Sequence, residues 1–284
     1  MSITTGTVEA RGLFWRWTAG DATDRAAGNP LVILHGLFGS GDNWRSQANS
    51  LAEGRIVLVP DMPNHGLSHH TDRTTYGEVA DTVWEALDSP ELAAALPERF
   101  TERPAGTRVA LLGHSMGGKA AMAMAFARPR AVERLLVADI APRRYEPSHE
   151  AIFRAMEAVA VGTVSGRGEA DRIMEPFVPE KAVRMFLLKS FASDGAGRYR
   201  WRLNLAGLRS GYADIVDWPY GDERYDGPVR FIAGGRSRYI EPADGETIER
   251  HFPDHEIETI PEAGHWLHAE ARDAFIGIVR RNIS

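Results

Sequence analysis

Six short apolar runs recur along the chain, and stretches with helical periodicity lie between most of them. Most of the runs are continuous rather than alternating, which is typical of strands buried on both faces of a parallel sheet. Strands that alternate with helices in this way predict an α/β sheet with helices on both faces. The predicted strands are LVIL (31–34), RIVLV (55–59), RVALL (108–112), RLLVA (134–138), VRFIA (229–233) and EIETI (256–260).

The first residues of the chain differ from these runs because apolar and polar residues alternate in VEARGLFWRW. This alternation predicts a leading antiparallel hairpin or edge strand within residues 1–17. The segments with helical periodicity between the apolar runs are predicted to be helices at 43–53, 76–87, 116–127, 242–251 and 267–281.

The strand–helix alternation lapses between residues 143 and 225. This stretch carries helical patterns at 151–161 and 179–191 and ends in an aromatic-rich segment, and we find no strand signal in it. We therefore predict a helical cap at 143–225, inserted after the sixth strand. It separates a core of residues 1–142 from its second part, residues 226–284.

Composition restricts the possible partners. The formal net charge is −6 and no stretch is densely basic, which argues against a nucleic-acid partner. Cysteine is absent, so disulfides and thiolate chemistry are excluded.

The N-terminus shows no secretory pattern, and the longest apolar run is far shorter than the ~20 residues of a membrane span. We expect a cytoplasmic protein without a membrane span, and the oligomeric state stays open.

A G-x-S-x-G pattern, Gly113-His114-Ser115-Met116-Gly117, lies between the strand RVALL and a helix of small residues. A strand, a nucleophile and a helix in this order form a nucleophile elbow, in which the tight turn requires glycines beside the serine. The alternative is a serine that only caps the helix. We favour Ser115 as the nucleophile.

A serine needs a base, and ten histidines are candidates. In sheets of this kind the base lies on the loop after the last strand. The segment EIETIPEAGHWLHAE places His265 in that loop, directly before the terminal helix. We predict that His265 is the base.

Two positions along the chain are candidates for the acid that orients this histidine. The common position is the loop after the penultimate strand, AGGRSRYIEPADG, where Arg238 occupies the expected place of an aspartate. Glu241 and Asp244 lie further along that loop. The other solution is the end of the preceding strand, where LLVADIAP places Asp139. A buried carboxylate there needs a partner such as an imidazole N–H, so we favour Asp139 and keep the other two as alternatives.

An oxyanion hole needs two convergent backbone donors. We predict the N–H groups of Met116 and of Leu37, with Phe38 as the less favoured choice, because HGLFGSGDNW is a glycine-rich loop after the first buried strand. The loop lacks the spacing of nucleotide-binding motifs. No metal-ligand spacing is found either, so we expect no metal and no cofactor.

The segment DMPNHGLS (61–68) contains Asp61, His65 and Ser68, which could form a second catalytic set. A turn that bonds to itself beside the site is the simpler interpretation, and we favour it.

Taken together, the segments HGLFGSGDNW, DMPNHGLS, LLGHSMGGKAAM, VADIAP and AGHWLHAE resemble the α/β-hydrolase superfamily. Within it they resemble the YbfF-type bacterial esterases and their mitochondrial relatives. The resemblance implies a mostly parallel, twisted sheet of eight strands with a helical cap, and the aspartate of D-I-A-P as the triad acid. It also implies hydrolysis of esters or thioesters, with small aryl or alkyl esters or acyl-CoA as substrates.

We therefore expect a serine hydrolase with the triad Ser115, His265 and Asp139. Phe38 and the cap residues Phe191, Trp201 and Leu203 would line an apolar acyl pocket, although the cap residues could equally be core. Two alternatives remain open. One is a cofactor-free C–C bond hydrolase or lyase on the same triad, with Arg202 or Arg238 binding an anion. The other is a non-catalytic ligand-binding protein.

Overall fold

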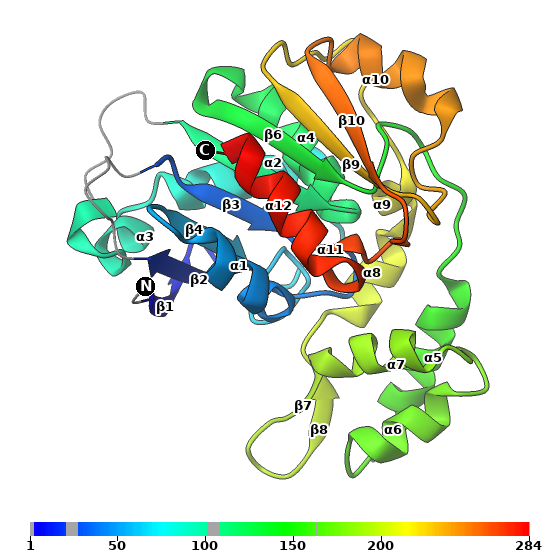
Figure 1. Ribbon diagram of the computed structural model, residues 1–284. Helices are drawn as coiled ribbons and strands as arrows, with labels where there is room; N and C mark the ends of the chain where they lie inside the picture. The colour runs from blue at the N-terminus through cyan, green and yellow to red at the C-terminus, as the bar shows by residue number, and fades with distance from the viewer. Residues whose placement is uncertain (1–2, 21–27, 101–107, 163, 284) are drawn as a thin grey trace.

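The computed structural model describes residues 3–20, 28–100, 108–162 and 164–283 (Figure 1). In this part of the chain eight strands form one sheet, in the order β1-β2-β4-β3-β5-β6-β9-β10. The pairs β1–β2 and β2–β4 are antiparallel and all others are parallel, which confirms the predicted fold class. The strands are β1 (Ile3–Ala10), β2 (Leu13–Gly20), β3 (Leu31–Leu34), β4 (Ile56–Pro60), β5 (Val109–His114), β6 (Val132–Ala138), β9 (Val229–Gly234) and β10 (His255–Ile260).

The helices of the core follow the predicted segments closely. The helices predicted at 76–87 and 116–127 have the predicted bounds. The predicted ranges 43–53 and 242–251 each begin in a 3-10 turn, and the range 267–281 is divided between two helices. One helix, α3, lies outside the predicted ranges, where Ser89 caps it and Pro90 opens it. The core helices are α1 (Arg45–Leu51) after a 3-10 turn at Gly41–Trp44, α2 (Tyr76–Leu87), α3 (Pro90–Ala95), α4 (Met116–Ala127), α10 (Gly245–His251) after a 3-10 turn at Pro242–Asp244, α11 (Leu267–Glu270) and α12 (Arg272–Ile283).

Both faces of the sheet are covered, which explains the continuous apolar runs. Adjacent residues of a strand point to opposite faces. In β3, Val32 and Leu34 therefore pack with residues of α2 and α4, whereas Leu31 and Ile33 pack with residues of α1 and α12. Figure 1 shows α1 and α12 in front of the sheet, with α2 and α4 behind it.

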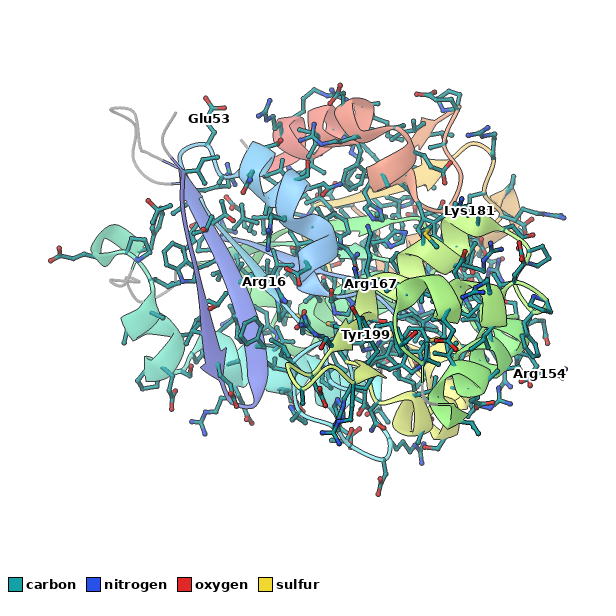
Figure 2. The ribbon with its side chains drawn as sticks, turned by 90° about the horizontal axis from the view of Figure 1, so that it is seen from below. Arg16, Glu53, Arg154, Arg167, Lys181 and Tyr199 are labelled. Atoms are coloured by element: carbon teal, nitrogen blue, oxygen red, sulfur yellow. The ribbon has the colours of Figure 1, made fainter. Side chains whose placement is uncertain are left out.

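Between β6 and β9 lies a largely helical insertion, which we call the cap. Its elements are α5 (Glu150–Val161), α6 (Arg167–Met174), α7 (Lys181–Leu187), a 3-10 turn at Leu188–Ser190, β7 (Phe191–Ser193), β8 (Tyr199–Trp201), α8 (Leu205–Ser210) and α9 (Tyr212–Val216). Figure 2 shows the cap helices that carry Arg154 and Lys181 on the opposite side of the molecule from the β1–β2 hairpin.

The small hairpin β7–β8 corrects the expectation of a cap without strands. Each of its strands has three residues, which is too short to show a two-residue alternation. Gly195 and Gly197 in the connecting turn both have positive φ angles, a conformation that favours glycine. The hairpin also shortens the helix predicted at 179–191, because β7 begins at Phe191.

The cap has its own buried core, separate from the two cores that flank the sheet. In the described residues, no helix combines the length and the apolar character that crossing a membrane requires.

Candidate active site

Ser115 occupies the turn between β5 and α4. Its φ and ψ angles are 54° and −123°, a conformation that non-glycine residues rarely adopt. A Cβ added to Gly113 would lie 2.1 Å from the carbonyl oxygen of Gly117, and one added to Gly117 would lie 2.2 Å from that of Leu34. The two glycines are therefore required by close backbone approach, and the turn has the geometry of a nucleophile elbow.

His265, from the loop after β10, bridges Ser115 and Asp139. Its Nε2 lies 3.0 Å from Ser115 Oγ, and its Nδ1 lies 2.7 Å from Oδ2 of Asp139. An ionised carboxylate only accepts hydrogen bonds, so Nδ1 carries the proton and Nε2 is free to accept from the hydroxyl. The arrangement can remove a proton from Ser115.

Asp139 is fully buried at the end of β6. Its Oδ1 accepts a hydrogen bond from the Gly234 N–H at 2.9 Å, and its Oδ2 accepts one from the Ser237 hydroxyl. Because β6 pairs with β9, the last residue of β9 and the loop that follows it supply the two donors to the carboxylate. These donors and the imidazole N–H satisfy the buried charge.

Ser237 was not predicted from the sequence. Arg238 occupies the expected place of an aspartate, but its side chain is exposed and pairs with Glu241 at 3.2 Å. Ser237, one residue earlier, contacts the acid of the preceding strand. A hydroxyl in the Gly-Gly-Arg-Ser turn after β9 was the available signal.

The alternative acids Glu241 and Asp244 are engaged elsewhere. Asp244 Oδ1 pairs with Arg143 Nε at 2.7 Å, and its Oδ2 accepts from the Glu241 N–H at 2.8 Å. The Glu241 carboxylate lies 3.2 Å from Arg238 and 3.8 Å from Arg143. In the described hydrogen bonds, His265 Nδ1–H donates to Asp139 and to neither alternative acid.

Backbone contacts in the glycine-rich loop after β3 distinguish Leu37 from Phe38. The Phe38 N–H donates to Nε2 of His65 at 3.1 Å, so it is engaged outside the site. Leu37 and Met116 line the same cavity as Ser115. The bond to His65 occupies the Phe38 N–H, and the Leu37 and Met116 N–H groups stay the predicted pair of oxyanion donors.

The segment at 61–68 forms a turn that bonds mostly to its own backbone and to neighbouring loops. The Ser68 hydroxyl donates to the Asp61 carbonyl at 2.6 Å, and Asp61 Oδ1 accepts from the Gly41 N–H and from Arg16, both at 2.7 Å. His65 contacts neither the Ser68 hydroxyl nor the Asp61 carboxylate through its described hydrogen bonds. These contacts agree with the turn interpretation rather than with a second catalytic set.

Known proteins that are similar to this chain include hydrolases. The chain matches the alpha/beta hydrolase family over residues 31–278. It belongs to the α/β hydrolase family. It is 40% identical to the sn-1-specific diacylglycerol lipase ABHD11 of Mus musculus, over 92% of this chain and 81% of that protein. It is 35% identical to Esterase YbfF of Escherichia coli, over 90% and 93% of the two chains.

A solved structure described as a marine microorganism esterase has the same fold. Its TM-score is 0.84 at 36% identity, with 95% of this chain and 98% of that chain covered. Like these relatives, this α/β hydrolase is a carboxylic ester hydrolase.

A cavity of about 570 Å³ opens onto Ser115 and His265 in this hydrolase. Part of its lining comes from the cap. The apolar members of that lining are Ile152, Val183, Phe186, Leu187, Ile215 and Val216. Phe38 also lines the cavity, as expected.

The other three residues expected in the acyl pocket lie elsewhere. Phe191, Trp201 and Leu203 belong to the core of the cap, outside the described lining of the cavity. Trp201 Nε1 donates to the carbonyl of Met156 on α5 at 3.0 Å. Phe191 and Trp201 belong to the β7–β8 hairpin and Leu203 follows it, whereas Val183, Phe186 and Leu187 of α7 line the cavity.

Tyr239 and Lys119 are among the cavity-lining residues that were not anticipated from the sequence. The Tyr239 ring stacks on His265, with ring centroids 3.8 Å apart and planes 17° apart. Lys119 is buried on α4, where burial lowers its pKa to about 7, and its Nζ donates to the carbonyls of Val216 and Asp217. Lys119 thereby ties the helix that follows Ser115 to the chain leaving the cap.

The buried histidines of this hydrolase make its stability depend on pH. Burial lowers the pKa of His65 to about 3, from an ordinary value of 6.5. Unfolding therefore takes up a proton below pH 6.5, so the contribution to stability is complete above pH 6.5 and is lost as the pH falls toward 3. Between pH 7.5 and 5.5 we expect His65→Gln to lose about 1.4 kcal/mol less of its free energy of unfolding than the wild type. Urea unfolding at both pH values measures this difference, and equal losses would contradict it.

Proposed function

We propose that this hydrolase cleaves carboxylic esters and thioesters by two-step acyl transfer on Ser115. The observation that carries the proposal is the hydrogen-bonded chain from Ser115 through His265 to Asp139, at 3.0 and 2.7 Å, which opens onto the cavity. A nucleophile, a base and an orienting carboxylate within hydrogen-bond distance are the parts required for acyl transfer.

In the first step, His265 Nε2 accepts the Ser115 proton while Oγ attacks the carbonyl carbon of the substrate. The N–H groups of Leu37 and Met116 stabilise the negative charge that develops on the carbonyl oxygen. His265 then donates its proton to the leaving alcohol or thiol, and an acyl-enzyme remains. Asp139 keeps the proton of the neutral imidazole on Nδ1 and stabilises the imidazolium.

In the second step, a water molecule loses a proton to His265 and attacks the acyl carbon. The same two N–H groups stabilise the second oxyanion. The proton returns from His265 to Ser115 Oγ, the carboxylic acid leaves and the enzyme is regenerated.

We propose that the cap, as residues 143–225 between core segments 1–142 and 226–284, selects the acyl group. The apolar side chains of Ile152, Val183 and Phe186 support an alkyl or aryl acyl group on that side of the cavity. Relatives named as a diacylglycerol lipase and as an esterase are consistent with small aryl or alkyl esters, with acyl-CoA as the thioester candidate.

Purified protein is expected to release p-nitrophenol from p-nitrophenyl butyrate and free thiol from butyryl-CoA, both dependent on Ser115. A fluorophosphonate probe should label the wild type and fail to label Ser115→Ala. Labelling without turnover of either substrate would favour a C–C bond hydrolase or lyase on the same residues. Failure to label the wild type would favour a non-catalytic binding protein.

A further inference from the structure

Two buried histidines outside the triad connect the oxyanion loop (residues 35–39) to the turn at residues 61–68. His35 belongs to the loop, and its Nε2 accepts a hydrogen bond from the Met62 N–H at 2.9 Å. His65 belongs to the turn, and its Nε2 accepts one from the Phe38 N–H at 3.1 Å. The rings meet edge to face with centroids 5.1 Å apart. Each segment thus uses one histidine to bind the backbone of the other.

The partners of the two Nδ1 atoms show which ring nitrogen carries the proton in each histidine. His65 Nδ1 lies 2.9 Å from the Pro63 carbonyl oxygen, and His35 Nδ1 lies 2.9 Å from that of Gly36. A carbonyl oxygen can only accept, so each Nδ1 carries the hydrogen and each Nε2 presents its lone pair. Both rings are neutral, and each uses its one donor and its one acceptor.

Two hydrogen bonds to the Gly36 carbonyl hold the peptide unit between Gly36 and Leu37 in one orientation. The Gly36 carbonyl accepts from His35 Nδ1–H and, at 3.1 Å, from the Gly39 N–H. In a trans peptide the carbonyl and the following N–H point in opposite directions. Because the Gly36 carbonyl points toward His35 Nδ1 and the Gly39 N–H, the Leu37 N–H points away from these two groups. A flip of this peptide would break both hydrogen bonds.

The next peptide unit depends on His65. Phe38 has a φ angle of 62°, in the left-handed region that disfavours a residue with a bulky side chain. In the described hydrogen bonds, its N–H donates to His65 Nε2. Without this acceptor, the buried N–H would lack a partner and the strained conformation would lose its support.

His65 is itself mounted on a rigid turn. Its N–H donates to the Met62 carbonyl at 3.0 Å, and its carbonyl accepts from the Ser68 N–H at 3.1 Å. Across the turn, Asp61 Oδ2 accepts from the Leu67 N–H at 2.9 Å. The imidazole is therefore a fixed support rather than a mobile side chain.

We propose that His65 is a positioning residue for ester hydrolysis, which holds the Phe38 N–H so that the Leu37 N–H stays directed at the oxyanion. The inference rests on the proposed function of Ser115 and Leu37 and adds a residue that touches neither substrate nor triad. Loss of His65 should affect only the states in which the substrate oxygen is negatively charged, because binding of the uncharged substrate does not need the Leu37 N–H.

The test compares three replacements of His65. Glutamine carries an acceptor oxygen at the same number of bonds from Cα as Nε2, whereas asparagine is one bond shorter and phenylalanine has no acceptor. Loss of an oxyanion donor typically lowers kcat by about 10²–10³-fold, so we expect about 10²-fold for His65→Phe and for His65→Asn. We expect His65→Gln to stay within about 10-fold of the wild type, and KM to change by less than about 3-fold in all three.

A second readout uses a trifluoromethyl ketone, which forms a negatively charged hemiketal with a reactive serine. Its inhibition constant should weaken in His65→Phe and His65→Asn by about the same factor as kcat falls. A change in KM at unchanged kcat would overturn the proposal, and so would equal losses in the glutamine and phenylalanine variants.

His251 provides the matched control. It is equally buried, its Nδ1 lies 2.6 Å from the Glu223 carbonyl oxygen, and its Nε2 accepts from Trp218 Nε1 at 3.2 Å. His251→Phe removes the same bonding pattern away from the oxyanion loop, so it should lower the melting temperature but leave kcat unchanged.

If His65→Phe does not fold, the glutamine and asparagine variants decide. Ser115→Ala in the same assay separates the two proposals, because hydrolysis that does not depend on Ser115 overturns the proposed function itself.

Discussion

Replacing Ser115 with alanine is expected to lower kcat for ester hydrolysis by about 10⁶-fold. The change removes the atom that forms the acyl-enzyme, while His265 and Asp139 keep their own hydrogen bond at 2.7 Å. The remaining rate would come from the oxyanion donors and from substrate binding alone. Release of p-nitrophenol from p-nitrophenyl butyrate, followed over hours at high enzyme concentration, measures so large a loss.

Ser89→Ala is the control for this change. Ser89 is a buried serine far from the site, and its Oγ caps α3 by accepting from the Leu92 N–H at 3.2 Å. Loss of the cap costs about 1 kcal/mol of stability, and kcat should not change. A Ser115→Ala enzyme with more than about one hundredth of the wild-type kcat would show that another group is the nucleophile.

Replacing Asp139 with asparagine is expected to lower kcat by about 10⁴-fold. The amide is nearly isosteric with the carboxylate, so the fold should persist. Its NH₂ group cannot accept from Nδ1–H, which favours the tautomer with the proton on Nε2, where it blocks the bond with Ser115 Oγ. The partly buried imidazolium that forms during the reaction also loses its counter-charge. Steady-state kinetics across pH 6–9 measures the effect.

Glu241→Gln is the matched control, because it makes the same carboxylate-to-amide change in the loop after β9. Glu241 is partly exposed and pairs with Arg238 and Arg143, so we expect kcat to stay within about 3-fold of the wild type. A near-normal Asp139→Asn enzyme together with an inactive Glu241→Gln enzyme would reverse the assignment of the acid.

Features set by local chemistry were predicted most accurately. The continuous apolar runs indicated the buried strands, because any strand covered on both faces must be apolar throughout. Helix α4 begins and ends at the predicted residues, and the glycines beside Ser115 marked the tight turn. Each of these signals lies within a few residues of the feature that it predicts.

Features set by contacts between distant elements were predicted less well. Ser237 was missed because its role depends on β9 lying beside β6, an adjacency that strand patterns do not reveal. Phe191, Trp201 and Leu203 are apolar and lie in the cap, yet composition cannot tell which apolar face lines a cavity and which forms a core. Only the tertiary structure shows that α7 lines the cavity while these three side chains lie in the core of the cap.

The sequence by itself determined the α/β fold, the elbow at Ser115 and the histidine on the last loop, since each depends on residue type and order along the chain. The tertiary structure decided which groups meet. His265 lies 126 positions from Asp139 and 150 from Ser115, and His65 lies 27 positions from Phe38. Hydrogen bonds require distances near 3 Å, and only the packed arrangement of strand ends brings such remote residues that close.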